Sequence, residues 1–469
     1  MKRRNNQEED HSVEQQSEEP RRFVKLSDQL RAQADDMRAH ADVFKVAADA
    51  MEEVERVYAS SPSSVPTCLE EPIKRQKVAV IPVTPKAKKE PKKVAEAKAT
   101  KKEKEATPEA SRKRSDAEKR IQKEMLRLDN YEAEKYLAVD AEGNPSMARA
   151  RELLDMFGVC VCPGVLRSSE CEEMVQGVWD FAATVTAKAA SVSLRPVKRD
   201  DPTTWKTAEK MLVSHGVQKN WGVGHAGVMW RLRQHPTVLT IFSQLWGVDK
   251  SGDDLLTSLD GFSLVPPPET TGNGWQNRSN AWLHCDQSFL RPGFRCWQSW
   301  VTGVDVKPGD GTFCFLEGSH KHHSAFQQRF QTTEKDDWFM LKTDQHINFY
   351  THEKACTLKH IACPKGSMVI WDSRLIHSGC GPIRGRPHHR ERCVAYLCFM
   401  PRHMASEADL QKKREAFESQ RTTSHWPVKT KLVPELKTGP RGIDISWLQS
   451  GAVKPEMTPK LKRLLGYDD

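Results

Sequence analysis

Aromatic residues are missing from a long stretch of this 469-residue chain. Residues 59–130 contain no Phe, Tyr or Trp, and all thirteen tryptophans lie at or beyond Trp179. Large side chains of this kind dominate the cores of packed domains, so their absence excludes a sizeable core in this stretch. We therefore expect the folded part of the protein to lie in the C-terminal two thirds of the chain.

Long apolar runs are also missing. The start, MKRRNNQEEDHSVEQQ, lacks the apolar stretch of a secretory signal, and no run of about 18 or more apolar residues predicts a membrane span. The twelve cysteines include no C-x-x-C pair, and Cys160 and Cys162 are too close for an ordinary disulfide. These absences predict an intracellular protein, nuclear or cytoplasmic, with reduced thiols.

The net charge of +9 is concentrated in one segment. Residues 71–125 hold 18 Lys or Arg against 9 Asp or Glu, which leaves 54 residues of each sign in the rest of the chain. Basic clusters at residues 74–77 and 112–114 are typical of nuclear import signals or of a tether to nucleic acid or chromatin. A solvated spacer of mixed charge explains them equally well.

The N-terminal third divides into three segments by composition. Residues 1–26 are polar and predict disorder, and residues 59–130 form a Pro-, Lys- and Ala-rich linker that also predicts disorder. Between them, residues 27–58 predict a helix. Its less polar residues follow a heptad spacing: Leu30, Ala34, Met37, Ala41, Phe44, Ala48 and Met51. This segment is either a coiled coil for self-association or a solitary amphipathic helix.

A folded α+β domain is expected over residues 131–402, followed by a C-terminal extension with short helices over residues 403–469. A helix should end at Gly158, and Ser169 with Glu172 should form a capping box at the start of the next. From about residue 261, short runs rich in Trp, Phe, Val and Cys alternate with turns. That texture is typical of an antiparallel sandwich or jelly roll.

Two stretches of this β region suggest a metal site. In NAWLHCDQSF, His284 and Asp286 are two residues apart, so in a strand both side chains would project from one face. KGSMVIWDSRLIHSGCG adds His377 after an apolar strand. Two histidines and one carboxylate can hold iron(II) and leave three positions open. The same ligands also suit a zinc hydrolase with a metal-bound water.

An arginine near these residues would separate the two interpretations. If 2-oxoglutarate binds the iron, its distal carboxylate needs a cation, and a guanidinium matches that carboxylate with two hydrogen bonds. RPHHRERCVAYLCFMPR offers Arg392 at the start of the following strand, with Arg390 two residues before it. A zinc hydrolase has no need for such an arginine.

These motifs together resemble the phytanoyl-CoA dioxygenase (PhyH) family of iron(II)- and 2-oxoglutarate-dependent oxygenases, from about Asp155 to Arg402. The segments that carry the resemblance are GVCVCPGVLRSSECEEM, WLHCDQ, GDGTFCFLEGSHK and MVIWDSRLIHSGCGPIRGRPHHRERCVAYLCF. The resemblance implies a double-stranded β-helix with flanking helices. It also implies the following site residues: His284, Asp286 and His377 on iron, and Arg392 (or Arg390) with Ser378 on 2-oxoglutarate.

The function implied by the resemblance is hydroxylation of a small organic substrate with release of succinate and carbon dioxide. Cys285 stands where the family often has glutamine, and its side chain should point away from the metal. Besides the zinc hydrolase, two alternatives remain. One is an inactive PhyH-like binding module, and the other is an oxidative demethylase tethered to chromatin by residues 71–125. The substrate does not follow from the fold.

Other conspicuous residues receive simpler interpretations. His320, His322 and His323 are expected to be solvated on a structural turn rather than to form a second metal site. His388 and His389 are expected on a plain loop. Four tryptophans near the first ligands are expected to be mostly core, with one or two lining a substrate pocket: Trp275, Trp282, Trp297 and Trp300.

Overall fold

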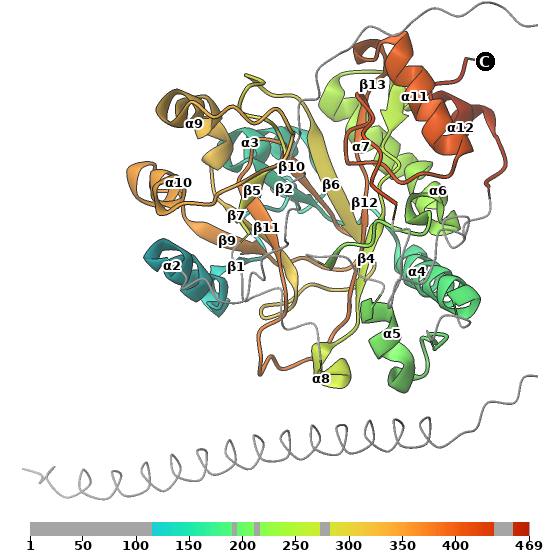
Figure 1. The fold of residues 1–469 in the computed structure, drawn as a ribbon, viewed down its shortest axis with the longest axis horizontal. Helices are drawn as coiled ribbons and strands as arrows, with labels where there is room; N and C mark the ends of the chain where they lie inside the picture. The colour runs from blue at the N-terminus through green and yellow to red at the C-terminus, as the bar shows by residue number, and fades with distance from the viewer. Residues whose placement is uncertain (1–114, 190–194, 211–215, 273–281, 436–453, 469) are drawn as a thin grey trace, which may run out of the picture. The chain divides into compact units, whose positions relative to one another are not determined.

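We describe the protein from a computed structural model that covers residues 115–189, 195–210, 216–272, 282–435 and 454–468. The predicted disordered segment 1–26, the predicted coiled coil 27–58 and most of the basic linker lie outside the described residues. Everything below concerns the part of the chain from residue 115 onward, coloured in Figure 1.

The predicted linker extends too far along the chain. Residues 115–130 were expected to be disordered, but helix α2 (Asp116–Met125) begins there with a capping box between Ser115 and Glu118. Its residues Ile121 and Met125 are buried in the same apolar cluster as strands of the domain. A helix needs only one apolar stripe in order to pack, so this segment joins the core without any aromatic residue.

Two facing sheets form the centre of the domain. The six-stranded sheet has the order β1-β9-β7-β11-β5-β8, and the five-stranded sheet has the order β2-β10-β6-β12-β4. Every strand pair is antiparallel except β1 with β9. The six-stranded sheet comprises β1 (Tyr131–Glu132), β9 (Leu358–Ile361), β7 (Thr312–Leu316), β11 (His377–Cys380), β5 (His284–Cys285) and β8 (Phe339–Met340). The five-stranded sheet comprises β2 (Val159–Cys162), β10 (Met368–Asp372), β6 (Trp297–Thr302), β12 (Arg392–Tyr396) and β4 (Phe262–Val265).

The chain passes back and forth between these sheets. Strands β4, β6, β10 and β12 lie in one sheet, and β5, β7, β9 and β11 lie in the other. Each strand alternates side chains between a face toward the opposite sheet and a face outward. This arrangement is the predicted double-stranded β-helix, and it encloses the side chains of both inner faces.

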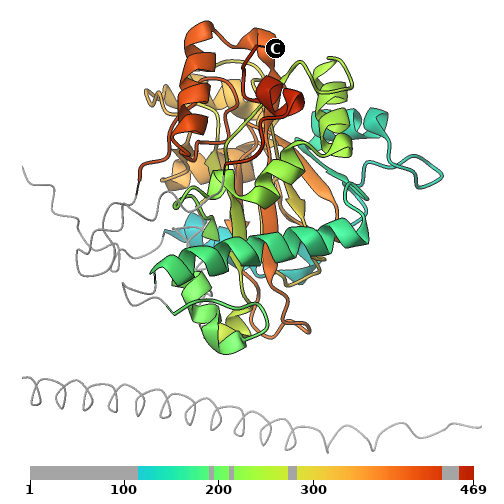
Figure 2. The same ribbon diagram turned by 90° about the vertical axis from the view of Figure 1, so that its right-hand side faces the viewer.

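Helices cover the outer faces of both sheets. Figure 2 shows the long helix α4 (Ser168–Lys188) crossing the five-stranded sheet, and its apolar residues share one cluster with that sheet. The same cluster includes residues of α3 (Met147–Phe157), α6 (Gly227–Arg233) and α7 (Pro236–Trp246). On the other side, α2, α9 (His323–Phe330) and α10 (Asp344–Asn348) lie outside the six-stranded sheet (Figure 1). Two short helices, α5 (Trp205–Lys210) and α8 (Pro268–Thr271), lie near the end of β4.

The predicted end of helix α3 is confirmed, but the predicted start of helix α4 is wrong. Helix α3 ends at Phe157, and Gly158 follows with φ of +80°, as expected for a glycine C-cap. The next capping box is wrong by two residues. Helix α4 begins at Ser168, so Arg167 is the N-cap and Glu170 is the residue that bonds back to its N–H.

The C-terminal extension packs onto the domain. Strand β13 (Phe399–Pro401) pairs with β3 (Leu255–Thr257), and helices α11 (Glu407–Glu418) and α12 (Pro459–Leu464) follow. Residues of both helices share an apolar cluster with Trp230. The extension is therefore part of the folded unit and not a loose tail.

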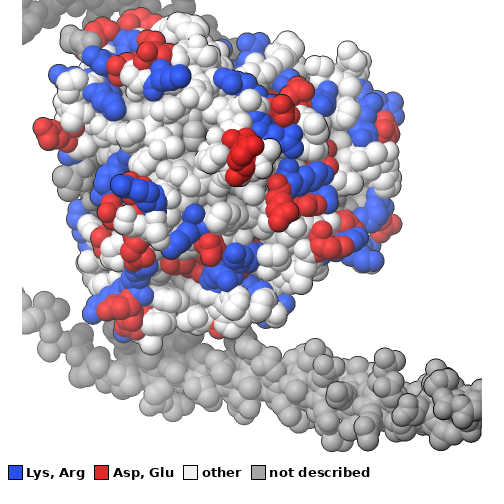
Figure 3. Space-filling model, turned by 180° about the vertical axis from the view of Figure 1, so that it is seen from behind, with Lys and Arg blue, Asp and Glu red and all other residues white. Residues whose placement is uncertain are grey.

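The surface and the thiols agree with the composition. On the face shown in Figure 3, acidic and basic side chains are interspersed. The eleven cysteines of the described ranges are all buried and in no disulfide. Among the described helices, none has the length and apolar character required to cross a bilayer.

Candidate metal centre

The three predicted metal ligands meet inside the β-helix. His284 on β5 pairs directly across the sheet with His377 on β11, and Asp286 follows at the bend after β5. One possible ligand atom from each residue lies within 4.8 Å of the others. Asp286 is 3.6 Å from Nε2 of His284 through Oδ1 and 3.4 Å from Nε2 of His377 through Oδ2. All three side chains are buried.

Hydrogen bonds orient both imidazoles toward the same point. Nδ1 of His284 lies 3.0 Å from the carbonyl oxygen of Trp282, and Nδ1 of His377 lies 2.9 Å from that of Leu375. A carbonyl only accepts, so each Nδ1 must carry the proton, and each Nε2 keeps its lone pair. Both lone pairs then face the carboxylate. This is the tautomer that a metal-binding histidine requires.

Asp286 is held from behind by a residue of the opposite sheet. Gln298 on β6 donates from Nε2 to Oδ2 of the carboxylate over 2.9 Å. Burial would raise the pKa of Asp286, but the neighbouring imidazoles of His425, His284 and His377 hold that pKa well below its usual range. The carboxylate is thus ionised and oriented, as a metal ligand must be.

The donor set fits a divalent transition metal. Metal bonds of about 2.0–2.2 Å place neighbouring ligands roughly 3 Å apart around the ion. The observed separations of 3.4 and 3.6 Å are slightly larger and leave room for an ion at the centre. Cys285 does not enter the set, because its Sγ lies 3.2 Å from the carbonyl oxygen of Gln287 and 3.4 Å from that of Ser373. It points away from the centre, as predicted.

A cavity of about 690 Å³ opens over these three residues. Trp282 stacks on the ring of His284 with 4.4 Å between centroids. Seven aromatic side chains contribute to the walls of the cavity: Trp282, Trp300, Phe313, Trp338, Trp371, Tyr396 and Trp426. Of the four tryptophans expected near the ligands, Trp282 and Trp300 line the cavity, Trp297 packs on Phe294, and Trp275 lies outside the described residues.

Three arginines line the same cavity, in different electrostatic settings. Arg386 is buried between the carboxylates of Glu269 and Asp310, at 2.9 Å from each. Arg390 also reaches Asp310, at 3.3 Å. Arg392 has no ion pair in the described part of the chain, and it lies 3.3 Å from the hydroxyl of Tyr396. Of the three arginines, Arg392 is therefore the one whose charge is not balanced by a neighbouring carboxylate of the described residues.

The direction of Arg392 follows from its strand. Val394, two residues along β12, belongs to the cluster of the barrel interior with Trp300 and Trp371. Side chains two apart share a face, so Arg392 and Tyr396 point into the same interior.

Ser378 does not join the site. It follows His377 on β11, so its side chain leaves the opposite face of the sheet. Its hydroxyl bonds to the carbonyl oxygen of Gly379 at 2.9 Å, and it pairs across the sheet with Cys314. Ser378 is therefore absent from the described lining of the cavity, and the structure gives no support to its predicted contact with the cosubstrate. The alternation of the strand places it outside the cavity.

The histidines of the Gly–Ser–His turn were expected to be solvated, and two of them are not. His320 is buried, with Nε2 3.1 Å from the carbonyl oxygen of Asp155. His323 is buried and stacks on Phe289 with 4.4 Å between centroids. His320 lies on the short 3-10 helix Ser319–His322 and His323 begins α9, so neither side chain is left on a solvated turn.

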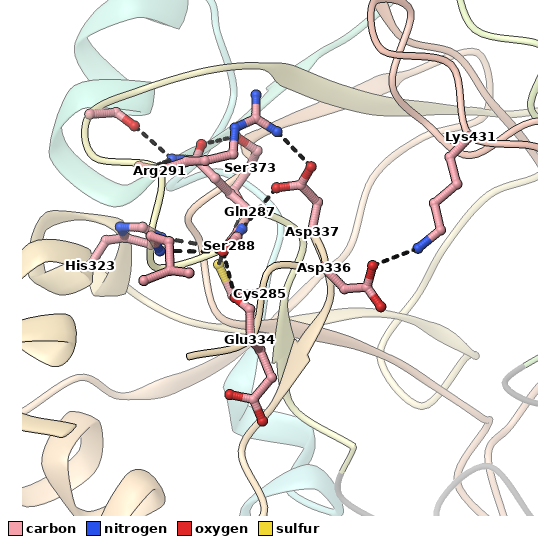
Figure 4. Close-up of polar contacts among 12 residues, drawn as sticks. Cys285, Gln287, Ser288, Arg291, His323, Glu334, Asp336, Asp337, Ser373 and Lys431 are labelled. Carbon is pink, nitrogen blue, oxygen red and sulfur yellow. Dashed lines mark hydrogen bonds and ion pairs between the residues drawn. The ribbon is translucent and has the colours of Figure 1, made fainter. Parts of the chain in front are cut away.

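A loop and the C-terminal extension border the cavity mouth. Asp336 and Asp337 lie side by side in Figure 4, where Asp337 binds Arg291 and Asp336 binds Lys431 of the extension. The next residue, Trp338, has its ring 5.9 Å from that of His284 and is 45% exposed, so it forms part of the rim. The amide of Ser288 anchors the loop from beneath by donating to Asp337.

Several of these residues were not predicted from the sequence. Gln298 lies in the mixed strand WQSWVT, where no local signal marks it as the partner of a metal ligand. Asp310, which receives two arginines, lies in an ordinary turn sequence. Lys431 and Trp426 belong to an extension whose position over the cavity has no local signature.

Comparisons with known proteins agree with this geometry. The family model of phytanoyl-CoA dioxygenase (PhyH) matches residues 154–383. A protein of Aspergillus versicolor, Ava biosynthesis cluster protein O, is 28% identical over 234 residues, which is 48% of this chain and 71% of that protein. The match to the family ends before Arg390 and Arg392.

Solved structures with similar folds are more distant. The epimerase SnoN, in complex with Fe³⁺, alpha-ketoglutarate and nogalamycin RO, shares 17% identity with a TM-score of 0.33, over 54% of this chain and 83% of that one. EctD from S. alaskensis, with 2-oxoglutarate and 5-hydroxyectoine, shares 13% sequence identity with a TM-score of 0.36. The match covers 58% of this chain and 79% of that one. Over residues 154–383, just under half of its length, this chain matches the phytanoyl-CoA dioxygenase (PhyH) family.

Proposed function

We propose that this protein is an iron(II)- and 2-oxoglutarate-dependent oxygenase that hydroxylates a small organic molecule. The observation that carries the proposal is the convergence of two Nε2 lone pairs and one oriented carboxylate beneath a cavity that also exposes an arginine. Two imidazoles and a carboxylate are the ligand set of non-haem iron(II) oxygenases. The match to the PhyH family points to the same class.

Arg392 is the proposed partner of the distal carboxylate of 2-oxoglutarate. Arg386 and Arg390 already share the charge of Asp310, while the side chain of Arg392 hydrogen-bonds, within the described ranges, only to the hydroxyl of Tyr396. A cation without a matched anion, facing a cavity, is the natural binding site for a carboxylate. Tyr396 would donate a second hydrogen bond to the same group.

The remaining residues prepare the cavity for this chemistry. When bound, iron(II) with 2-oxoglutarate and oxygen would supply the oxidising power, with succinate and carbon dioxide as products. Gln298 keeps Asp286 in its binding orientation, and the backbone carbonyls behind His284 and His377 fix the imidazole rings. The aromatic side chains of the cavity wall offer flat apolar surfaces to a substrate.

The cavity supports a small molecule rather than a macromolecule as substrate. Its volume of about 690 Å³ is within the usual range for small-ligand sites. The Aspergillus relative is named for a biosynthesis cluster, which supports a role in making or tailoring a natural product. SnoN is an epimerase, so epimerisation is the second candidate reaction.

The test is succinate formation by the full chain, purified without oxygen, loaded with iron(II) and given 2-oxoglutarate and air. Turnover without the true substrate forms succinate slowly, so the assay does not require that substrate. We expect succinate from the wild type, none from His377→Ala, and a strongly raised KM for 2-oxoglutarate in Arg392→Ala.

Arg390→Ala is the matched control for the arginine. It lines the same cavity but is paired with Asp310, so we expect a KM for 2-oxoglutarate within about threefold of wild type. No succinate from the wild type, with zinc retained and no binding of 2-oxoglutarate by calorimetry, would favour the zinc hydrolase. An absence of both metal and 2-oxoglutarate binding would favour the inactive module.

A further inference from the structure

The six-stranded sheet carries a second cluster of potential ligands on its outer face. Cys314 on β7, His360 on β9 and Cys380 on β11 each place one ligand atom within 4.8 Å of the other two. Cys314 and His360 are direct cross-strand partners. Cys380 pairs with Thr312, two residues from Cys314 on the same face, so the three side chains form a compact triangle over adjacent strands.

This triangle is separate from the centre inside the barrel. Phe313 and Phe315, the neighbours of Cys314 on β7, belong to the interior cluster, whereas Cys314 packs with Met125 of α2 in the outer one. Side chains alternate along a strand, so the sheet itself lies between the two groups of ligands. The proposed function does not use any of these three residues.

His360 is the unusual member of the cluster. Its side chain is fully buried, and neither Nδ1 nor Nε2 has a hydrogen-bond partner among the described residues. The ring of Tyr131 stacks on it at 4.6 Å, with an interplanar angle of 11°. Buried polar groups are almost always satisfied, so a buried imidazole with two unpaired nitrogens calls for a missing partner. A metal ion at the triangle would bind one of these nitrogens.

We propose that Cys314, His360 and Cys380 form a second metal site that binds a thiophilic cation, zinc(II) or copper(I). Two thiolates and one imidazole favour these ions over iron(II), magnesium or calcium. Two thiolates exactly neutralise zinc(II), which suits a buried site, whereas three ligands are a full set for copper(I). The shared chemistry is sulfur coordination, which the inner centre lacks.

The site would join parts of the chain that are far apart in sequence. It ties β9, β7 and β11 together beneath α2, and β11 also carries His377 on its inner face. Its role is therefore structural. A bound ion would fix the strand that presents a ligand to the inner centre.

Cobalt(II) is the probe that distinguishes the two centres. Thiolate coordination gives cobalt a charge-transfer band in the near ultraviolet, and a site of two imidazoles and a carboxylate cannot produce it. We expect the full chain, reduced and free of metal, to bind two cobalt ions with this band. His377→Ala should bind one and keep the band. Cys314→Ala and Cys380→Ala should bind one and lose it.

Cys393→Ala is the matched control, because Cys393 is a buried cysteine of β12 outside the cluster. It should keep both ions and the band. If a cysteine variant fails to fold, His360→Phe takes its place, because it preserves the stacking on Tyr131 and should lose the band. Competition with chelators then compares zinc(II) with copper(I). A wild type without the band, or a band that survives in both cysteine variants, would overturn the proposal. So would a count of ten free thiols in the denatured chain, because a disulfide would then occupy the cysteines.

Discussion

The two faces of the six-stranded sheet present different ligands on the same strands. On the inner face, His284 and His377 meet a carboxylate and an open cavity. On the outer face, Cys314 and Cys380 meet a histidine beneath α2. Hard and borderline donors next to an open volume suit catalysis, while thiols in a closed layer suit a structural ion. The surroundings of each face, more than the strand, decide what the ligands can do.

The largest effect should follow from removing a ligand of the inner face. In His377→Ala we expect iron binding to weaken and succinate formation to fall by more than about 100-fold, because loss of even an outer partner of a metal ligand costs about 10–100-fold. Iron stoichiometry and succinate yield measure this. Ser378→Ala, the next residue on the other face, should leave both unchanged. Equal iron affinity in wild type and His377→Ala would refute the assignment.

A smaller effect should follow at the residue behind the carboxylate. Gln298→Leu removes the donor to Asp286 at nearly constant volume, so we expect iron affinity to fall by about 10–100-fold while the fold persists. Equilibrium dialysis with iron(II) under nitrogen measures it. Ser299→Ala, whose hydroxyl bonds to Leu397 on the other side of the strand, should retain wild-type affinity. If both variants bind iron equally well, Gln298 does not position the ligand.

The inner centre was predictable from the sequence for a specific reason. His284 and Asp286 are nearly adjacent, and His377 closes an apolar strand, so each signal is local. Gln298 was not predictable in this way, because its role arises only when β6 faces β5 across the barrel.

The outer cluster could not be predicted from the sequence. Cys314, His360 and Cys380 are dozens of residues apart, and only the register of three strands brings them together. The sequence instead drew attention to His320 and His323, whose clustering along the chain does not become a cluster of ligands. Helix α2 was missed because it packs through small and aliphatic residues, which composition alone cannot distinguish from a linker.

A buried histidine outside the sheet should make the stability of the protein sensitive to acid. His323, outside the sheet, stacks on Phe289, and burial lowers its pKa to about 4. The unfolded chain binds this proton near pH 6.5, so the free energy of unfolding should fall as pH drops from about 6.5 to 4, by up to about 1.4 kcal/mol per pH unit. Urea titrations across this pH range measure how steeply the free energy of unfolding changes with pH. In His323→Phe this slope should correspond to one proton fewer taken up on unfolding.

The remaining acid dependence has another source. His225 is also buried, next to the carbonyl oxygen of Arg421, and its pKa is likewise lowered to about 4. It should supply the slope that persists in His323→Phe. The exposed His389→Phe serves as control and should keep the full wild-type slope. A full slope in His323→Phe as well would show that His323 does not titrate on unfolding.

The smallest effects should appear at the cavity mouth, where two neighbouring ion pairs differ in exposure. Lys431 and Asp336 are 66% and 76% exposed, whereas Arg291 and Asp337 are 24% and 26% exposed, and Arg291 also lies over the ring of Trp426 at 4.5 Å. Exposed pairs contribute about 0.2–1 kcal/mol at most, so Lys431→Met should change the free energy of unfolding by less than about 0.5 kcal/mol and Arg291→Met by more. Binding of 2-oxoglutarate, measured by calorimetry, should be unchanged in Lys431→Met, because the proposed clamp lies inside the barrel and not at its rim. A large loss of 2-oxoglutarate affinity in that variant would move the anion site from the inner face to the mouth.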